Sequence, residues 1–268
     1  MALNYLKLEE ADIRLDNIAK EEAFGKLPEQ IINFLNNDVL NYILHTLKYP
    51  KNDIVSARVL NNWIKENVVV IEENDRGRIK RFNKLQCIWL NIVEEARKYG
   101  MYLEDLKRIH RELLTSDIKN LTYLKIGVIN EILNESQILE LSPSSNCAII
   151  SESNYNKKKK LSPHVVSRLI FSLSTLVQRE FPKANFDLPI TIENYIADED
   201  KLLLLFLLKT YSYEYMKVYL SSNDIRLIEN PTLIVNNKDL HQAISSWSFL
   251  KIEIYLERGA TTVINGIL

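Results

Sequence analysis

The sequence has few of the residues that mark several specialised classes of protein. Its 268 residues include two cysteines, six glycines and seven prolines. Neither Cys87 nor Cys147 lies in a Cys-x-x-Cys motif or a Cys/His cluster that could hold a metal ion, and two cysteines are too few for a disulfide framework. The low glycine and proline content excludes collagen-like and linker-like chains. We therefore expect a globular protein with reduced cysteines, no cofactor and no metal site.

Long apolar runs are also missing. The most apolar run, residues 202–208, is seven residues long, whereas about 20 are needed to cross a bilayer. Residues 1–16 include several acidic side chains and lack the unbroken apolar core of a signal peptide. We expect a cytoplasmic protein without a membrane partner.

The charge is balanced overall but segregated along the chain. There are 34 Lys and Arg residues against 35 Asp and Glu residues, which gives a net charge of -1. Residues 54–111, however, hold twelve basic and eight acidic side chains, and residues 76–84 carry five positive charges and no negative one. Such a patch attracts phosphate, although an isolated charge run is more often a solvated loop.

Two helices joined by a short break are predicted before the basic run. Apolar residues at helical spacing predict a first helix over residues 27–47, and Pro50 predicts a break after it. A second helix begins at Ser56, whose hydroxyl can cap the amide of Arg58 or Val59. The apolar residues expected to be buried are Val59, Leu60, Trp63 and Ile64. The polar residues expected to face outward are Arg58, Asn61, Asn62 and Lys65.

A β-hairpin is predicted after these helices. The β-prone residues 68–71 and 78–82 flank a polar loop. A basic hairpin directly after a helix-turn-helix can serve as a wing, which lies along the DNA backbone while the second helix enters the major groove. Further helices are predicted over residues 84–99 and 103–114, separated by Gly100.

Three segments follow one another in a characteristic order. They are VSARVLNNW (55–63), GRIKRF (77–82) and IVEEARKYGMYLEDLK (92–107). In this order and spacing, residues 54–113 resemble the MerR family of winged-helix transcription regulators. The resemblance implies binding to double-stranded DNA, and it implies a homodimer. The sequence departs from the family pattern at Asn61, where the family often has Arg.

The resemblance also implies roles for individual residues. On the second helix, Arg can pair with guanine and Asn with adenine. The candidates for base contact are Ser56, Arg58, Asn61 and Asn62. The basic residues of the hairpin would contact phosphates, which fixes register without reading sequence. These candidates are Arg76, Arg78, Lys80, Arg81 and Lys84. The alternative for Asn61 and Asn62 is ordinary exposure to solvent.

The rest of the chain predicts a mixture of helices and strands with no recognisable functional motif. Helices are expected over residues 120–139, 163–181 and 198–209. Strands are expected over residues 147–150, 213–220, 225–229, 251–257 and 260–264. The fold class is therefore α+β, with a mainly helical winged helix-turn-helix domain followed by an α+β domain with a smaller sheet. The predicted domains are an N-terminal extension (1–37), a winged-helix domain (38–119), a helical connector (120–139) and the α+β C-terminal domain (140–268).

The sequence leaves several functions open. The leading interpretation is a sequence-specific DNA-binding protein, a transcription regulator whose C-terminal domain binds an effector or a protein partner or forms the dimer. A winged helix can also act as an accessory factor in recombination or mobile-element control, or bind a protein through the same faces. An enzyme ranks last, because the sequence has no nucleophile, paired-carboxylate or phosphate-loop constellation, and no catalytic residue is assigned.

Overall fold

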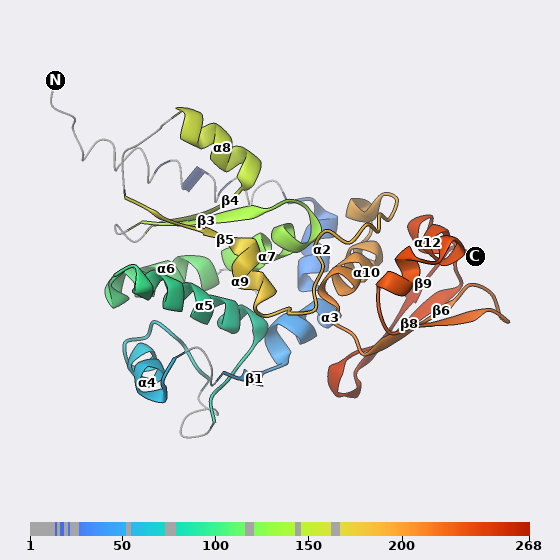
Figure 1. Cartoon of the computed structure of the whole chain (residues 1–268), viewed down its shortest axis with the longest axis horizontal. Coiled ribbons are helices and arrows are strands. Elements are labelled where there is room, and N and C mark those ends of the chain that lie inside the picture. Colours follow the sequence, from blue (N-terminus) through green and yellow to red (C-terminus); the bar gives the residue numbers. More distant parts are fainter. Residues whose placement is uncertain are drawn as a thin grey trace. The chain divides into compact units, whose positions relative to one another are not determined.

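The chain folds into two compact units (Figure 1). The computed structural model describes residues 14, 17–18, 21, 27–51, 55–72, 79–115, 121–142, 146–161 and 167–268. Unit 1 comprises residues 1–27 and 41–180, and unit 2 comprises residues 28–40 and 181–268. This division differs from the domains predicted from the sequence, whose boundaries follow residues 37, 119 and 139. The fold is mixed α+β, as the sequence predicts.

Unit 1 packs helices against a small antiparallel sheet. Its helices are η1 (Tyr42–Thr46), α4 (Ala57–Lys65), α5 (Lys84–Lys98), α6 (Leu103–Leu114), α7 (Tyr123–Leu133), α8 (Glu152–Leu161) and α9 (Leu173–Gln178). Its strands are β1 (Tyr49–Pro50), β2 (Arg81–Phe82), β3 (Gln137–Leu141), β4 (Cys147–Ser151) and β5 (Leu169–Ser172). Strands β3, β4 and β5 form one sheet in the order β4-β3-β5, and β1 pairs with β2. Helices α5 and α6 have the predicted bounds to within one residue.

Helix α7 is the central helix of unit 1 rather than a connector. It contacts α6, α9 and the strands β3 and β4, and ten of its eleven residues are buried. The Tyr123 hydroxyl donates to the Ile149 carbonyl and accepts from the Ile149 amide, both at 2.9 Å. The predicted helical segment 120–139 is therefore wrong at its end, because residues 137–139 belong to strand β3.

The predicted hairpin is wrong in its pairing. Residues 68–71 form no strand, and the strand β2 pairs antiparallel with β1, which places Tyr49 opposite Phe82. The physical reason is the burial of this segment. Val68 and Val69 are buried, and their amides donate to the Trp63 carbonyl just after α4 instead of joining a ladder. The loop predicted to form the tip of the wing, residues 73–78, lies outside the described residues.

Two of the predicted helices also need correction. The first helix, expected over residues 27–47, is interrupted at Asn37, whose extended backbone (φ -56°, ψ 136°) ends α2 (Glu29–Asn36). It continues as α3 (Asp38–Asn41) and then as the π-helical turn η1. In the helix expected over residues 163–181, residues 169–172 instead form β5, because this apolar and aromatic run pairs with β3.

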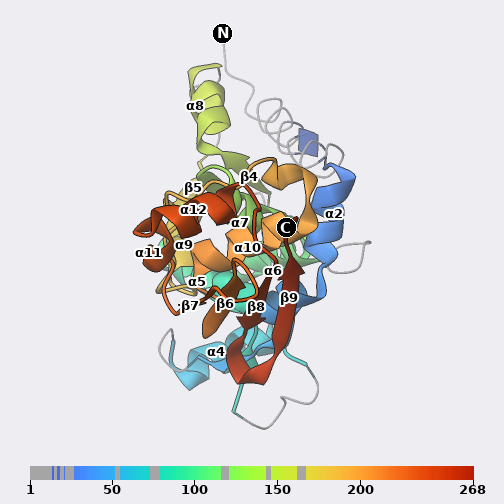
Figure 2. The ribbon, with the colours of Figure 1, turned by 90° about the vertical axis from the view of Figure 1, so that its right-hand side faces the viewer.

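Unit 2 is built around a four-stranded antiparallel sheet (Figure 2). Its strands are β6 (Tyr215–Tyr219), β7 (Ile225–Ile228), β8 (Lys251–Tyr255) and β9 (Thr261–Asn265), in the order β7-β6-β8-β9. Its helices are α2, η3 (Tyr195–Ala197), α10 (Glu199–Thr210), α11 (Thr232–Val235), α12 (Lys238–Ser245) and η4 (Glu257–Gly259). All four strands and α10 lie where the sequence predicts them.

Aromatic packing explains why residues 28–40 belong to unit 2. Phe206 of α10 packs edge-on against Phe34 of α2 and against Phe181, with ring centroids 6.4 and 6.3 Å apart. The Asn37 amide also donates to the Glu199 carboxylate at 2.5 Å. Burying three phenylalanines in one cluster removes apolar surface from water and so stabilises unit 2. Helix α2 therefore packs with residues that lie more than 140 positions later in the sequence.

Replacing Gly127 with Ala should destabilise unit 1. A Cβ atom at this position would lie 2.8 Å from both Cδ1 and Cγ2 of Ile149. Glycine to alanine inside a helix normally gains about 1 kcal/mol, but overpacking costs about 1 to 3 kcal/mol. We expect a net loss of unfolding free energy, measured by urea denaturation. The Ile149→Ala background should make Gly127→Ala less costly by about 1 kcal/mol or more. Additive effects of the two changes would contradict the close contact.

Acidification from pH 6.5 to 4 should weaken the fold through two histidines. Burial lowers the pKa of His45 to about 4, with help from Lys125, and burial alone lowers the pKa of His110 to about 4. Between pH 6.5 and 4 the unfolded chain therefore binds more protons than the native protein, so the free energy of unfolding falls as pH falls.

A His110 variant tests this assignment. His110 packs edge-on against Trp89, with ring centroids 5.4 Å apart, and His110→Phe keeps the ring while removing the titration. Urea midpoints measured at pH 7 and pH 4.5 should fall less for the variant than for the parent protein. Equal falls would mean that His110 does not contribute.

Candidate nucleic-acid interface

Helix α4 is held in place by a cap at its start and two anchors on one face. The Ser56 hydroxyl accepts a hydrogen bond from the Val59 amide at 3.4 Å, which confirms the predicted cap. Leu60 and Trp63 are buried, as predicted. Val59 was expected to be buried as well, but 39% of it is exposed. This prediction is wrong because the short helix buries only a narrow stripe, and Val59 lies beside it.

The opposite side of α4 carries the polar residues. Arg58, Asn61, Asn62 and Lys65 are all exposed, and their i, i+3, i+4, i+7 spacing places them on one side of the helix. We call these four residues the polar face of α4. Ser56, at the cap, is exposed next to it. The outward orientation predicted for these residues is confirmed.

The polar face lines an open groove of about 840 Å³ within unit 1. The opposite wall comes from the end of α5 and the start of α6, and it includes Glu94, Arg97, Lys98 and Leu103. We call this hollow the α4 groove. Its lining holds four basic residues and one acidic residue, so the groove is cationic and suited to a ligand with negative charge.

The basic residues of the groove differ in how much of their charge is already balanced. The Lys98 ammonium lies 3.2 Å from carboxylate oxygens of both Glu94 and Glu95, and its hydrogen bonds to them raise its pKa. The Arg97 guanidinium donates to the Met101 carbonyl, which carries no net charge. Arg58 and Lys65 form no ion pair with any residue that the structure describes. Arg58, Lys65 and Arg97 therefore supply most of the positive charge.

Of the predicted phosphate contacts, Arg76 and Arg78 lie outside the described residues. The other three lie in three different settings. Arg81 is exposed on β2, and Lys80 is half-buried, where its ammonium donates to the Asn61 side-chain carbonyl. Lys84 points into unit 1 instead, because its ammonium donates to the Glu180 carbonyl at 2.5 Å and lies 4.6 Å from the Tyr49 ring centroid.

The groove also includes Lys65 and Arg97, which are not among the DNA-contact residues predicted from the sequence. Lys65 and Arg97 belong to the basic segment 54–111, and Lys65 follows Arg58 by two helical turns. A helical projection of residues 57–65 therefore places Lys65 on the same side of the helix as Arg58. No local pattern predicts that Arg97 lines this groove, because its position opposite α4 depends on how α4 and α5 are arranged in unit 1.

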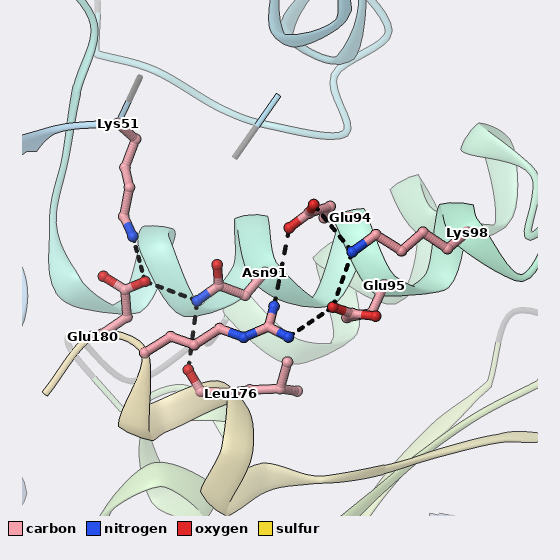
Figure 3. A network of polar contacts seen from close by, with 8 residues as sticks. Lys51, Asn91, Glu94, Glu95, Lys98, Leu176 and Glu180 are labelled. Atoms are coloured by element: carbon pink, nitrogen blue, oxygen red, sulfur yellow. Dashed lines mark hydrogen bonds and ion pairs between the residues drawn. The ribbon is translucent and has the colours of Figure 1, made fainter. Parts of the chain in front are cut away.

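The buried carboxylate of Glu180 joins three segments of unit 1 (Figure 3). Glu180 is 5% exposed, and its Oε1 accepts from the Lys51 ammonium at 2.5 Å and from the Asn91 amide at 2.8 Å. Asn91 also reaches the Leu176 carbonyl at 3.5 Å. The contacts join the end of β1, the middle of α5 and the end of α9, and α5 also supplies one wall of the α4 groove.

Both cysteines are free thiols. Burial, followed by the nearby Glu180 carboxylate, raises the pKa of Cys87 to about 12, so the thiol stays protonated at neutral pH. Cys147 is also buried. In the described part of the chain, no group of three or more His, Cys, Asp and Glu residues is arranged to hold a metal ion.

Among the helices that the structure describes, none is long and apolar enough to cross a bilayer.

Removing the Glu180 carboxylate should destabilise unit 1 strongly. Glu180→Leu leaves the Lys51 ammonium without its carboxylate and leaves the Asn91 amide with only its longer bond to the Leu176 carbonyl. Breaking a largely buried ion pair costs about 3 kcal/mol. We expect a loss of this size in urea denaturation.

Two further variants check that the effect comes from the buried pair. Arg179→Ala breaks exposed ion pairs with Glu94 and Glu95 and should cost less than about 1 kcal/mol. Adding Lys51→Met to Glu180→Leu should recover part of the loss, because the orphaned charge is removed. Equal losses for Glu180→Leu and Arg179→Ala would contradict this assignment.

Comparisons of the chain with protein-family models, with curated proteins and with solved structures found no match.

Proposed function

We propose that this protein binds double-stranded DNA through unit 1, with the polar face of α4 directed into the major groove. The observation that carries the proposal is the placement of Arg58, Asn61, Asn62 and Lys65 on one exposed face beside the cationic α4 groove. A major groove about 12 Å wide admits a helix of this kind, and Arg and Asn side chains suit hydrogen bonds to its base edges.

The contacts within unit 1 suggest a division of roles. Arg58 and Asn62 are the main candidates for reading bases, since the side-chain carbonyl of Asn61 already accepts from the Lys80 ammonium. Lys65, Arg81 and Arg97 suit phosphate contacts, which position the protein without reading sequence. Lys84 is a structural residue in this proposal, because its ammonium is held by the Glu180 carbonyl. The proposal therefore narrows the set of base-reading residues predicted from the sequence.

The biological role follows from the same proposal. The role we propose is that of a cytoplasmic, MerR-like transcription regulator that binds an inverted repeat as a homodimer. The base-reading helix α4 and the resemblance of residues 54–113 to the MerR family both support this role. An accessory role in recombination or mobile-element control uses the same duplex contact, and the two roles differ in target sites rather than in binding chemistry. In both cases the protein acts by binding and not as an enzyme.

Selection of binding sites from random duplex DNA tests the proposal. We expect enrichment of an inverted repeat, and Arg58→Ala should weaken binding to the enriched site by about 5- to 150-fold, as for the loss of one bidentate base contact. Fluorescence anisotropy with labelled duplex measures the affinity. Lys238→Ala is a matched control, because it removes one exposed positive charge from a helix of unit 2, and its affinity should not change.

Salt dependence separates base contacts from phosphate contacts. Lys65→Ala should reduce the slope of log affinity against log salt by about 0.9 and weaken binding to all duplex sequences alike. Flat enrichment with a folded protein, or a protein partner whose binding survives high salt and is unaffected by Arg58→Ala, would favour a protein-interaction module instead.

A further inference from the structure

The sheet of unit 2 has one face that presents aromatic rings and charges to solvent. In an antiparallel sheet, residues directly opposite one another point to the same side. On the two central strands this register pairs Tyr215 with Tyr255, Lys217 with Glu253, and Tyr219 with Lys251. The alternate residues Met216, Val218, Ile252 and Ile254 are buried on the other side. We call the six outward residues the tyrosine–lysine face.

Each half of this face combines a ring with an ammonium group. The Lys217 ammonium lies 5.3 Å from the centroid of the Tyr255 ring, and the Lys251 ammonium lies 4.5 Å from the centroid of the Tyr219 ring. Each ring–ammonium pair spans the neighbouring strands β6 and β8. A ligand that matches this face needs flat π-systems and negative charge close to them.

The rings are ordered before any ligand arrives. Tyr215 and Tyr255 stack with ring centroids 4.2 Å apart and an interplanar angle of 17°. The Tyr219 and Tyr255 hydroxyls donate to the Glu253 carboxylate at 3.0 and 3.3 Å, and the Lys251 ammonium donates to it at 2.6 Å. Side chains fixed in this way lose little conformational entropy on binding.

Exposed aliphatic residues extend the platform on both sides. Leu227 of β7 lies opposite Lys217, and Val263 of β9 lies opposite Glu253, so both share the face. Each is 52% exposed. The face is therefore wider than the two central strands and offers apolar contact beside the aromatic rings.

We propose that the tyrosine–lysine face of unit 2 binds single-stranded nucleic acid. Bases stack on the tyrosines, and Lys217, which forms no ion pair with any described residue, pairs with a phosphate between them. Lys251 stays paired with Glu253. This activity is independent of duplex binding by α4, and it uses a different unit of the chain.

Three arguments favour this ligand. The faces of bases are accessible in single strands but not in a duplex, and an open sheet with aromatic side chains is a platform for stacking them. The cores of protein–protein interfaces are depleted in Lys and Glu, whereas this face has Lys217, Lys251 and Glu253 on its central strands. Glu253 is neutralised by Lys251, and its carboxylate can accept hydrogen bonds from base amino groups.

Fluorescence anisotropy with labelled dT20 and U20 tests the proposal on the full chain at low salt. Both strands should bind, and the difference between them reports preference for DNA or RNA. Tyr255→Leu should weaken binding about tenfold, whereas Tyr255→Phe, which keeps the ring, should bind within about twofold of the parent. Lys217→Ala should weaken binding and reduce the salt slope by about 0.7, with Lys238→Ala as the control for loss of one exposed charge.

The variants also separate this surface from the α4 groove. Arg58→Ala should leave dT20 and U20 binding unchanged, and Tyr255→Leu should leave duplex binding unchanged. The far-ultraviolet circular dichroism of each variant checks its fold, and Lys217→Ala provides a second route if Tyr255→Leu unfolds. Failure of the parent protein to bind either strand, or unchanged binding in both Tyr255→Leu and Lys217→Ala, would overturn the proposal. A dimer that dissociates on Tyr255→Leu without any affinity for either strand would overturn it in favour of a second copy of the chain.

Discussion

The Glu180 carboxylate is the polar contact on which the candidate interface depends. It is buried, and it accepts from Lys51 and Asn91, while the carbonyl of the same residue accepts from Lys84. Lys51 follows β1, Asn91 lies in α5 and Lys84 starts α5, so Glu180 ties β1 and the helix that forms one wall of the α4 groove to a single residue. Since a buried charge is costly unless it is paired, loss of one partner weakens the rest of this arrangement.

The sequence predicted best those features that depend on residues close together in the chain. Helix α4 begins at the Ser56 cap, and α5 ends before Gly100, whose positive φ of 85° few other residues adopt readily. The periodic apolar residues of α5 and α6 predicted both helices. The outward set Arg58, Asn61 and Asn62 followed from the same helical spacing.

The features that the sequence did not reveal depend on contacts between distant segments. The strand at Arg81 pairs with Pro50 rather than with the β-prone run near Val69. The residue pattern of the strand at Arg81 does not show which of these two segments it pairs with. Lys84 belongs to the basic run by composition, yet its partner Glu180 lies 96 residues away. The tyrosine–lysine face likewise depends on the register of β6 against β8, which no single segment contains.

Backbone amide chemical shifts, followed as duplex DNA of the enriched sequence is added, test the central claim most directly. If the polar face of α4 enters the major groove, the largest shifts will fall within residues 57–65 and 79–84, and the amides of α12 will not move. Large shifts confined to unit 2, or unchanged spectra at saturating duplex, would contradict the account.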